Sequence, residues 1–359
     1  MAPVALEFQR FTDGCEPLLI STGQHREILY RSLEPFGLKP DTDLDIMQHG
    51  ANLAQVTSRA LEKLDALIER RKPALILGQG DTTTTFVAAL NAFYRGILFG
   101  HVEAGLRTDT IHNPFPEEFN RRAAGLTADL HFPPTEWSKQ NLLREGKDPA
   151  TIYVTGNTGI DAVLEAARVG DHSWFPEWPG RVIVMTTHRR ENWGLPQKNI
   201  AESALRIVND FPDTLLVVAM HPNPIVRETL EPILGGHPRI KLIEPPAYGE
   251  FVKLMQRSTI ILSDSGGVQE EAPAFGIPVL VLRDTTERPE GVDAGTAKLV
   301  GTDPERVYGE AAKLLSDPAA FKAMANAVSP YGDGHAAARV RFICLQKLGV
   351  PSPPVEMWS

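Results

Sequence analysis

The sequence predicts an α/β protein with two Rossmann-like domains, each built on a parallel sheet, that face a cleft. Short apolar runs rich in β-branched residues alternate with amphipathic stretches along the chain, which is the pattern of strands and helices in turn. The runs are apolar throughout, as in strands that helices cover on both faces. The 359 residues leave room for two domains at ~100–200 residues each.

Each predicted strand is a short apolar run. In the first domain these runs are Leu18–Ser21, Ala74–Gly78, Ile97–His101 and Ile152–Val154. In the second domain they are Val182–Thr186, Thr214–Ala219, Ile240–Ile243, Ile260–Ser263 and Val279–Leu282. The amphipathic stretches between them predict helices at Glu27–Phe36, Ala54–Arg70, Thr83–Tyr94, Trp137–Glu145, Ile225–Leu234, Phe251–Arg257 and Gly267–Phe275.

A stretch rich in glycine, proline and tryptophan, Gly170–Gly180, separates the two series and predicts the domain linker. The predicted domains are therefore residues 1–169 and 170–333. A last amphipathic stretch, Ala336–Leu348, follows a turn-rich segment. We expect residues 334–359 to form a helix that crosses back to the first domain.

Charge and cysteine content exclude several classes of protein. The chain has 36 Lys and Arg against 45 Asp and Glu, a net charge of −9, which is the wrong sign for general binding of nucleic acid. Its only cysteines, Cys15 and Cys344, can form neither a disulfide framework nor a cysteine-based zinc site. No apolar run approaches the ~18 residues of a membrane span, and no export signal opens the chain. We expect a cytoplasmic protein that binds neither nucleic acid nor membranes.

Three carboxylates follow strand ends in the first domain. Asp81 and Glu103 come directly after the predicted strands Ala74–Gly78 and Ile97–His101, and Glu117 follows a proline-rich turn. Asp81 could instead be a helix N-cap, and Glu117 a first-turn acid that the helix dipole favours. Glu103 has no capping role. Because the carboxyl ends of parallel strands meet at one edge of a sheet, the three acids together predict a site for general acid and base chemistry.

The second domain offers groups that suit an anionic ligand. His188 and two arginines follow the strand Val182–Thr186, where they could bind anionic oxygen or form a solvated loop. Two glycines after the strand Ile260–Ser263 allow the backbone to approach a phosphate at a helix start. Glu271, one turn later, could bind a ribose diol or pair with a lysine. The chain has neither the P-loop pattern nor GxGxxG. These features predict a nucleotide-linked substrate.

Six segments together resemble one family, the non-hydrolysing UDP-N-acetylglucosamine 2-epimerases. The segments follow the family's order over residues 1–334 and are GDTTTT (80–85), HVEAGLRT (101–108), PFPEE (114–118), THRREN (187–192), SDSGGVQEEAP (263–273) and RDTTERPE (283–290). The resemblance implies a glycosyltransferase-B fold, a homodimer, and reversible interconversion of UDP-GlcNAc and UDP-ManNAc that needs no metal and no redox cofactor.

The resemblance also implies a role for each matching residue. Acid–base chemistry falls to Asp81, Glu103 and Glu117. UDP is held by His188, Ser265, Gly266, Gly267, Glu271 and Arg288, with Phe251 at a neighbouring nucleotide contact. His188 would also meet the charge on the leaving diphosphate. The implied reaction eliminates UDP to give 2-acetamidoglucal, then returns a proton to the other face of C2 together with UDP, so two proton-handling groups are needed.

Three segments depart from the family pattern. The family begins with a strand and a Gly-Thr-Arg-Pro-Glu turn that contacts the nucleotide, whereas this chain starts at a segment that resembles the helix after that turn. We expect either that the native chain starts upstream of Met1, or that the first strand and its arginine are missing. In the second case Arg107 or Arg189 is the first candidate to meet the nucleotide charge, and Arg107 is in any case predicted to bind substrate. An activating UDP-GlcNAc site of bacterial members is matched only in part, at residues 24–27 and 48–51. Pro246 stands where some members have a nucleotide-contacting glutamine.

Two other functions remain open. A glycosyltransferase of the same two-domain fold would recognise UDP in the same way, although GDTTTT and HVEAGLRT argue against it. A catalytically silent UDP-sugar sensor would share the binding residues and lack turnover. Incubation with UDP-GlcNAc in deuterated water separates the three, because only epimerisation places deuterium at C2.

Overall fold

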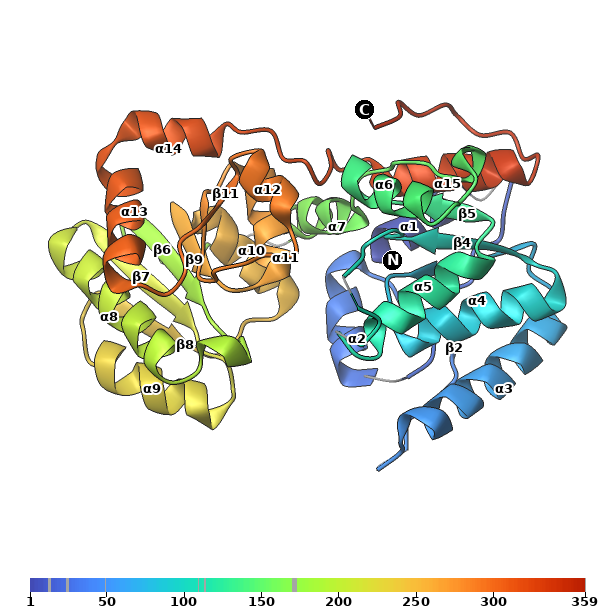
Figure 1. Ribbon diagram of the computed structural model, residues 1–359, viewed down its shortest axis with the longest axis horizontal. Helices are drawn as coiled ribbons and strands as arrows, with labels where there is room; N and C mark the ends of the chain where they lie inside the picture. The colour runs from blue at the N-terminus through green and yellow to red at the C-terminus, as the bar shows by residue number, and fades with distance from the viewer. Residues whose placement is uncertain are drawn as a thin grey trace. The chain divides into compact units, whose positions relative to one another are not determined.

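The computed structural model describes residues 1–11, 14–23, 26–48, 50–108, 110–112, 114–169 and 173–358. The chain forms two compact units, Met1–Ala162 with Tyr331–Ser359, and Val163–Pro330 (Figure 1). These boundaries lie a few residues before the predicted ones because the segment after residue 162 packs on the second unit. Lys253 Nζ donates to the Ala167 carbonyl at 2.6 Å, and Trp174 Nε1 donates to the Glu250 carbonyl at 2.9 Å. Residues 170–172 of the predicted linker lie outside the described residues.

The first unit contains a parallel three-stranded sheet in the order β3 (Leu75–Gln79), β4 (Leu98–Val102), β5 (Leu130–Phe132). A separate parallel pair joins β1 (Ile20–Ser21) to β2 (Thr42–Asp43). The predicted strand Ile152–Val154 is wrong, because only Ile152 makes a single bridge, to His131. Two short strands, β2 and β5, were not predicted, since a run as short as Leu-His-Phe gives too little apolar signal to be recognised.

Helices cover both faces of this sheet. The helices of the first unit are α1 (Ala2–Gln9), α2 (Arg26–Leu33), α3 (Leu53–Arg71), α4 (Thr83–Arg95), α5 (Glu117–Thr127), α6 (Glu136–Arg144) and α15 (Ala336–Lys347), with short 3-10 helices at Glu34–Phe36 and Pro149–Thr151. α7 (Thr158–Ala166) crosses the boundary between the two units. Residues of α3 and α4 form one core cluster with Phe99. On the other side α15 lies beside α1 (Figure 1), and its apolar residues pack with Leu130 and Phe132.

Local sequence sets where α4 begins and ends. Thr82 is its N-cap, with Oγ1 accepting from the Thr85 amide at 3.3 Å, and Gly96 ends it in the left-handed conformation at φ 63°. Asp81 therefore does not cap α4, which leaves its carboxylate available for another role.

The second unit is built on one six-stranded parallel sheet in the order β11-β10-β9-β6-β7-β8. The strands are β6 (Arg181–Thr186), β7 (Thr214–Ala219), β8 (Ile240–Ile243), β9 (Ile260–Ser263), β10 (Val279–Val281) and β11 (Ala297–Leu299). All five strands predicted for this domain are confirmed. β11 was not predicted, because Lys298 interrupts its apolar run.

Helices pack on both faces of the second sheet as well. They are α8 (Leu195–Asp210), α9 (Pro224–Leu234), α10 (Tyr248–Arg257), α11 (Gly266–Glu271), α12 (Pro289–Asp293), α13 (Pro304–Ser316) and α14 (Pro318–Ala325), with 3-10 helices at Arg190–Asn192 and Ala272–Phe275. Residues of α8, α9 and α13 share one core with β6, β7 and β9. Two parallel sheets of this kind confirm the predicted α/β fold class. No described helix has the length and apolar character that crossing a membrane requires.

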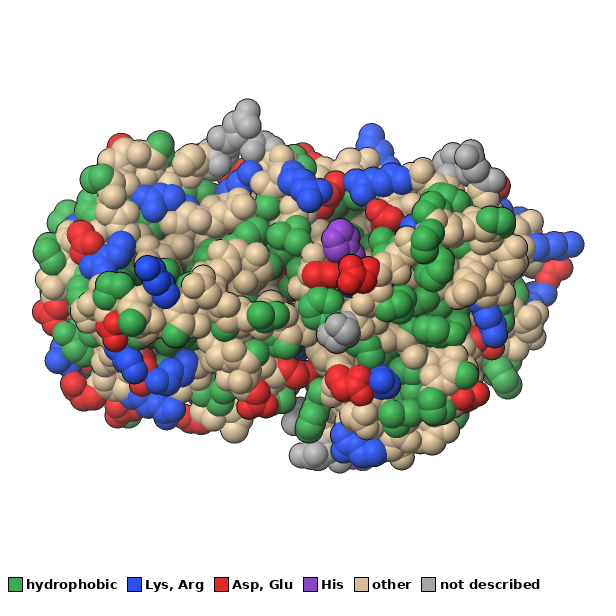
Figure 2. All heavy atoms as spheres, turned by 90° about the horizontal axis from the view of Figure 1, so that it is seen from above, with side chains coloured by type: hydrophobic (Ala, Val, Ile, Leu, Met, Phe, Trp, Pro, Cys, Tyr) green, Lys and Arg blue, Asp and Glu red, His purple; other side chains and the backbone are tan. Residues whose placement is uncertain are grey.

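Basic and acidic side chains lie interspersed on the face drawn in Figure 2. A nucleic-acid backbone binds to continuous positive surface. Positive and negative side chains alternate on this face, so it does not form such a continuous positive surface.

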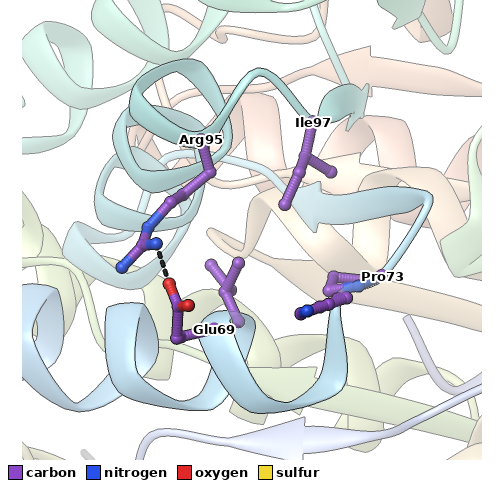
Figure 3. Close-up of a pocket in the computed structure, with 6 residues that line it drawn as sticks. Glu69, Pro73, Arg95 and Ile97 are labelled. Atoms are coloured by element: carbon purple, nitrogen blue, oxygen red, sulfur yellow. Dashed lines mark hydrogen bonds and ion pairs between the residues drawn. The ribbon is translucent and has the colours of Figure 1, made fainter.

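A cavity of about 250 Å³ lies in the first unit at the starts of β3 and β4 (Figure 3). It is lined by Ile68, Glu69, Lys72, Pro73, Arg95 and Ile97. Arg95 is paired with Glu69 and with Asp65, whose Oδ1 lies 2.7 Å from Nε. Ligands of open α/β sheets bind beyond the carboxyl ends of the strands, which is the opposite edge. The candidate site is therefore sought at those carboxyl ends.

Candidate active site

The strand order of the second unit locates a crevice for a ligand. From β6 the chain runs through β7 and β8 to one side, then returns through β9, β10 and β11 on the other side. β6 and β9 are therefore neighbours, with Thr186 paired to Ser263 at their carboxyl ends. Such a reversal of strand order is the place where doubly wound sheets bind ligands. His188 follows one of these strands and Ser265 follows the other.

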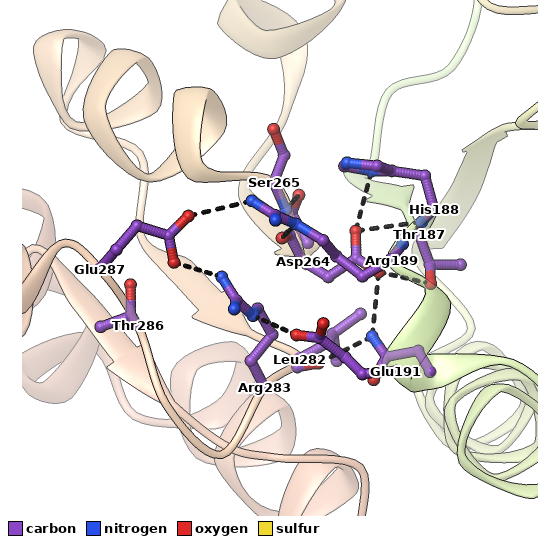
Figure 4. A network of polar contacts seen from close by, with 12 residues as sticks. Thr187, His188, Arg189, Glu191, Asp264, Ser265, Leu282, Arg283, Thr286 and Glu287 are labelled. Carbon is purple, nitrogen blue, oxygen red and sulfur yellow. Dashed lines mark hydrogen bonds and ion pairs between the residues drawn. The ribbon is translucent and has the colours of Figure 1, made fainter. Parts of the chain in front are cut away.

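Asp264 ties the loop after β6 to the loop after β9 (Figure 4). Its carboxylate is fully buried and accepts from the amides of His188 and Arg189 at 3.0 Å. It also accepts from Thr187 Oγ1 and Asn192 Nδ2, each at 2.9 Å, and lies 3.0 Å from His188 Nδ1. Burial raises the pKa of Asp264, but these hydrogen bonds outweigh burial and hold the pKa below its usual value. The buried carboxylate is thus kept ionised.

A cavity of about 340 Å³ opens beside His188 in the second unit. It is lined by Thr186, Thr187, His188, Ala219, His221, Pro245, Pro246, Tyr248 and Phe251. The rings of His188 and His221 stack with centroids 6.0 Å apart. Burial and the neighbouring His188 lower the pKa of His221. His188, Pro246 and Phe251, three residues named from sequence, therefore border one largely apolar cavity, whereas His221 and Tyr248 were not predicted.

Glu271 lies next to Tyr248, whose hydroxyl donates to Oε1 at 3.3 Å. Burial and the nearby Glu270 raise the pKa of Glu271 to about 8. Burial and Glu271 in turn raise the pKa of the Tyr248 hydroxyl. A carboxyl in such surroundings is stabilised as an anion by additional hydrogen-bond donors, and the two hydroxyls of a ribose are donors of this kind.

Arg288 is paired with two carboxylates. Its Nε lies 2.7 Å from Glu270 Oε1, and its Nη1 lies 3.3 Å from Glu287 Oε1. A Cβ at Gly266 would lie 3.2 Å from the Arg288 guanidinium carbon, so the glycine leaves room for the arginine to cross the start of α11. A side chain at position 266 would therefore crowd Arg288. Ser265, the N-cap of α11, makes no side-chain capping hydrogen bond, and Gly267 is exposed.

Carboxylates and arginines alternate around Glu287. Arg189 Nη2 reaches Glu287 Oε1 at 3.0 Å, and Arg283 Nη1 reaches Oε2 at 2.6 Å. Arg283 also pairs with Glu191 at 2.8 Å (Figure 4). The loops after β6 and β10 are therefore crosslinked by ion pairs, and Arg189 is engaged with a protein carboxylate.

In the first unit, Asp81 and Glu103 lie close together at the ends of β3 and β4. The strands are paired at Gln79 and Val102, and Gly80 turns away at φ 72° with a Cβ position 3.4 Å from Glu103 Oε2. Glu103 itself has φ 60°, a strained conformation for a residue with a side chain and one that clusters at functional sites. Gln79 Nε2 donates to Glu103 Oε2 at 3.2 Å. The turn thus presents both acids at the same sheet edge.

Asp81 forms an ion pair that the sequence did not reveal. Its Oδ2 accepts from Arg121 Nη2 at 2.5 Å, and its carbonyl accepts from Asn120 Nδ2 at 3.0 Å. Both partners lie on α5, so these two contacts join the turn after β3 to this helix. Arg121 is therefore an additional candidate for an active-site residue, and only its position in the folded chain identifies it.

The two glutamates at the start of α5 have different environments. Glu118 is fully buried and accepts from the Thr108 amide at 3.1 Å and from Arg122 Nε at 2.7 Å. Within the described part of the chain, no hydrogen bond or ion pair engages the Glu117 carboxylate. Glu118 therefore fixes the loop before α5, and Glu117 is the acid that remains available.

Arg107, predicted to bind substrate, is paired with a protein carboxylate, and its role toward substrate stays a prediction. Its side chain is only 8% exposed and pairs with Glu145, with Nε–Oε1 at 2.6 Å and Nη2–Oε2 at 2.8 Å. Its third nitrogen, Nη1, donates to the Leu106 carbonyl. This hydrogen bonding lowers the pKa of Glu145. We therefore assign Arg107 to holding the loop after β4 against the end of α6.

His101 fixes the turn that precedes Asp81. Its Nε2 lies 2.8 Å from the Gly80 carbonyl, and the ring is buried. Burial lowers the pKa of His101 to about 4, so the ring is neutral at pH 7 and donates from Nε2. Among the described residues, no group of three or more His, Cys, Asp and Glu side chains could hold a metal ion.

The comparisons with known proteins agree with one another. A family model described as UDP-N-acetylglucosamine 2-epimerase matches residues 9–344. The chain is 49% identical over 342 residues to the UDP-N-acetylglucosamine 2-epimerase of Bacillus subtilis, covering 95% of this chain and 90% of that one. The chain belongs to the UDP-N-acetylglucosamine 2-epimerase family. The family predicted from the six sequence segments is thereby confirmed.

Solved structures of this family have the same fold. A putative UDP-N-acetylglucosamine 2-epimerase from Listeria monocytogenes superposes with a TM-score of 0.94 at 46% identity, covering 100% of this chain and 95% of that chain. The UDP-GlcNAc 2-epimerase from Neisseria meningitidis, bound to UDP-GlcNAc, gives a TM-score of 0.85 at 44% identity, with 96% of each chain covered.

Proposed function

We propose that this member of the epimerase family interconverts UDP-GlcNAc and UDP-ManNAc by eliminating UDP and adding it back. The single observation that supports this best is that one chain combines an anion-binding site with a pair of acids suited to proton transfer. A cavity and cationic groups lie at the strand reversal of the second unit, and two acids follow the ends of neighbouring strands in the first unit. The Neisseria relative is described as bound to UDP-GlcNAc, which is the substrate proposed here.

In this proposal the second unit holds UDP. Phe251 and Pro246 give the cavity flat apolar surface for the pyrimidine base. Glu271 accepts from the ribose hydroxyls. His188 and Arg288 meet the charge of the diphosphate, which requires Arg288 to exchange Glu270 and Glu287 for phosphate oxygens. Ser265, Gly266 and Gly267 complete the diphosphate contact through the start of α11.

The first unit supplies the proton chemistry. As the bond from C1 of the sugar to the UDP oxygen breaks, a carboxylate removes the C2 hydrogen as a proton, and a C1–C2 double bond forms. A second group then delivers a proton to the other face of C2 while the UDP oxygen returns to C1. Asp81, Glu103 and Glu117 are the proposed acids and bases, because two faces of one carbon need separate groups. The net reaction inverts C2 and consumes no other reactant.

Deuterium incorporation tests this function. The enzyme is incubated with UDP-GlcNAc in deuterated water, and the sugar C2 is followed by proton NMR. We expect loss of the C2 proton signal in both epimers together with formation of UDP-ManNAc. An unchanged sugar would identify a binding protein, and sugar transfer that depends on an added acceptor would identify a transferase.

We further propose that the protein is a homodimer that buries the outer faces of α4 and α5. Phe86 and Phe93 lie seven residues apart on α4, and Phe119 and Leu126 lie seven apart on α5. The Phe86 and Phe119 rings meet edge to face at 5.7 Å, so the two rows adjoin. Phe93 is 64% exposed and Leu126 is 76% exposed. Apolar surface of this kind marks contact with another protein, and the family resemblance points to a second copy of this chain.

We also infer that the enzyme works in the cytoplasm. Cys344 is buried in the core of the first unit, and Cys15 Sγ contacts the Phe11 carbonyl at 3.3 Å, so the two cysteines are separate thiols. Free thiols suit a reducing compartment.

A further inference from the structure

Asp264 is the most heavily hydrogen-bonded acid of the site in the second unit, yet it was not among the residues predicted to bind or react. It directly precedes the Ser265-Gly266-Gly267 segment, and it is fully buried beneath the loop that begins with Thr187 (Figure 4). Its five donors all come from the loop after β6: two amides, a hydroxyl, a side-chain amide and an imidazole.

We propose that Asp264 is a positioning residue for His188, which it holds in the tautomer with the proton on Nδ1, so that Nε2 is the ring atom offered to the diphosphate. The role of His188 rests on the proposed function, whereas the tautomer follows from the contacts alone. A neutral imidazole has one N–H, and the carboxylate 3.0 Å from Nδ1 accepts but cannot donate while ionised. The proton is therefore stabilised on Nδ1.

The other contacts of Asp264 explain why the ring has one orientation. The His188 and Arg189 amides fix the backbone on both sides of the imidazole, each at 3.0 Å from Oδ2. Stacking on the His221 ring restricts rotation of the imidazole plane. Among the described residues, none is hydrogen-bonded to His188 Nε2, and the side chain is 39% exposed. The ring is thus fixed at one edge and open at the other.

This arrangement gives Asp264 two separable effects. As a hub for backbone amides it orders the loop, and as the partner of Nδ1 it selects the tautomer. Only the second effect reaches the ligand chemistry, because a ring with its proton on Nε2 would offer a neutral donor and could not accept a proton there.

The tautomer is measured directly by ¹⁵N NMR of histidine-labelled protein without nucleotide, with His188 assigned by its disappearance in His188→Asn. We expect the neutral ring to carry its proton on Nδ1 in the wild-type protein, and to shift toward the Nε2 form in Asp264→Asn. A wild-type ring protonated on Nε2 overturns the proposal, even if the Asn variant fails to fold. This readout is independent of epimerase activity, so it stands or falls separately from the proposed function.

Kinetics separate positioning from simple loop ordering. Asp264→Asn should lower kcat by tenfold or more, within the ~10–10⁴-fold range for loss of a group behind a functional histidine. In a His188→Asn background the same change should cost less than about threefold, because residues that act as a unit are not additive. Equal losses in both backgrounds overturn the proposal.

Asn192→Ala is the matched control. It removes one donor to Asp264 and a hydrogen bond to the Leu282 carbonyl, and leaves the contact with His188 Nδ1 in place. We expect it to lower stability while the His188 tautomer is retained and kcat stays within about threefold of wild type. A loss of kcat as large as that of Asp264→Asn, with the tautomer unchanged, would show that Asp264 acts only by ordering the loop.

Discussion

Asp81 and Arg121 form an ion pair across forty positions of sequence, with Oδ2 and Nη2 2.5 Å apart. The pair links the turn after β3 to α5. It places a guanidinium directly beside an acid that is proposed to handle the proton at C2.

Replacing Asp81 by asparagine should lower kcat by at least ~10²-fold, the scale of a lost general acid or base, while UDP binding is largely kept. The amide has the same shape but cannot take up a proton. Asp129→Asn is a matched control, because Asp129 accepts from the Phe99 amide at 2.8 Å at the other end of β4. That control should affect stability alone. Near-normal turnover of Asp81→Asn, Glu103→Gln and Glu117→Gln would remove the three acids from the mechanism.

Replacing Arg288 by alanine should weaken UDP binding about ten- to a hundredfold, since a hydrogen bond to a charged group contributes ~1.5–3 kcal/mol. Calorimetric titration with UDP measures the change. Arg206→Ala is the control, because Arg206 is likewise held by carboxylates, Glu305 and Asp210, on helices of the second unit. UDP affinity that is unchanged in Arg288→Ala would exclude Arg288 from the diphosphate site.

Glu271 should make the ligand-free protein less stable as pH rises. Its pKa is about 8 in the folded protein against 4.5 ordinarily, mainly through burial. Between these values the folded protein holds a proton that the unfolded chain has lost, so the free energy of unfolding falls with rising pH. Glu271→Gln removes this titrating carboxyl and with it this pH dependence. Relative to wild type, the variant should melt increasingly higher from pH 5 to pH 8 and show no further gain above that.

Thermal unfolding of both proteins at each pH measures this difference, and other titrating groups cancel in the comparison. Melting changes about 2–4 °C per kcal/mol for a unit of this size. A difference between the two proteins that does not vary with pH would contradict the raised pKa. Tyr248→Phe removes the hydroxyl that donates to Glu271 and lowers its pKa, so this variant should strengthen the pH dependence.

Replacing Phe93 by glutamate should dissociate the proposed dimer, because a charge on an interface face is costly to bury. Light scattering after gel filtration measures the mass. Val328→Glu is the control, since Val328 is also exposed but lies in the second unit. Phe93→Glu that retains the wild-type mass, or a wild-type protein that is monomeric, would show that α4 and α5 do not form the contact.

The sequence by itself determined the fold class and the family, and it predicted candidate site residues at the strand ends. Parallel strands covered on both faces must be apolar throughout, so β6 to β10 could be predicted from apolar runs such as Val182–Thr186. The acids Asp81 and Glu103 follow such runs directly, and the carboxyl ends of adjacent parallel strands necessarily meet.

Only the tertiary structure decided which charges are free and which are already paired. Arg107, for example, forms an ion pair with Glu145, 38 positions away, which its place in the sequence does not indicate. Asp264 was not among the predicted site residues, yet its buried carboxylate lies 3.0 Å from His188 Nδ1. The physical reason is that a side chain's partners come from elements that meet through packing and strand order. Sequence spacing fixes contacts within a helix or turn, whereas the pairing of distant charges depends on how the sheets and helices assemble.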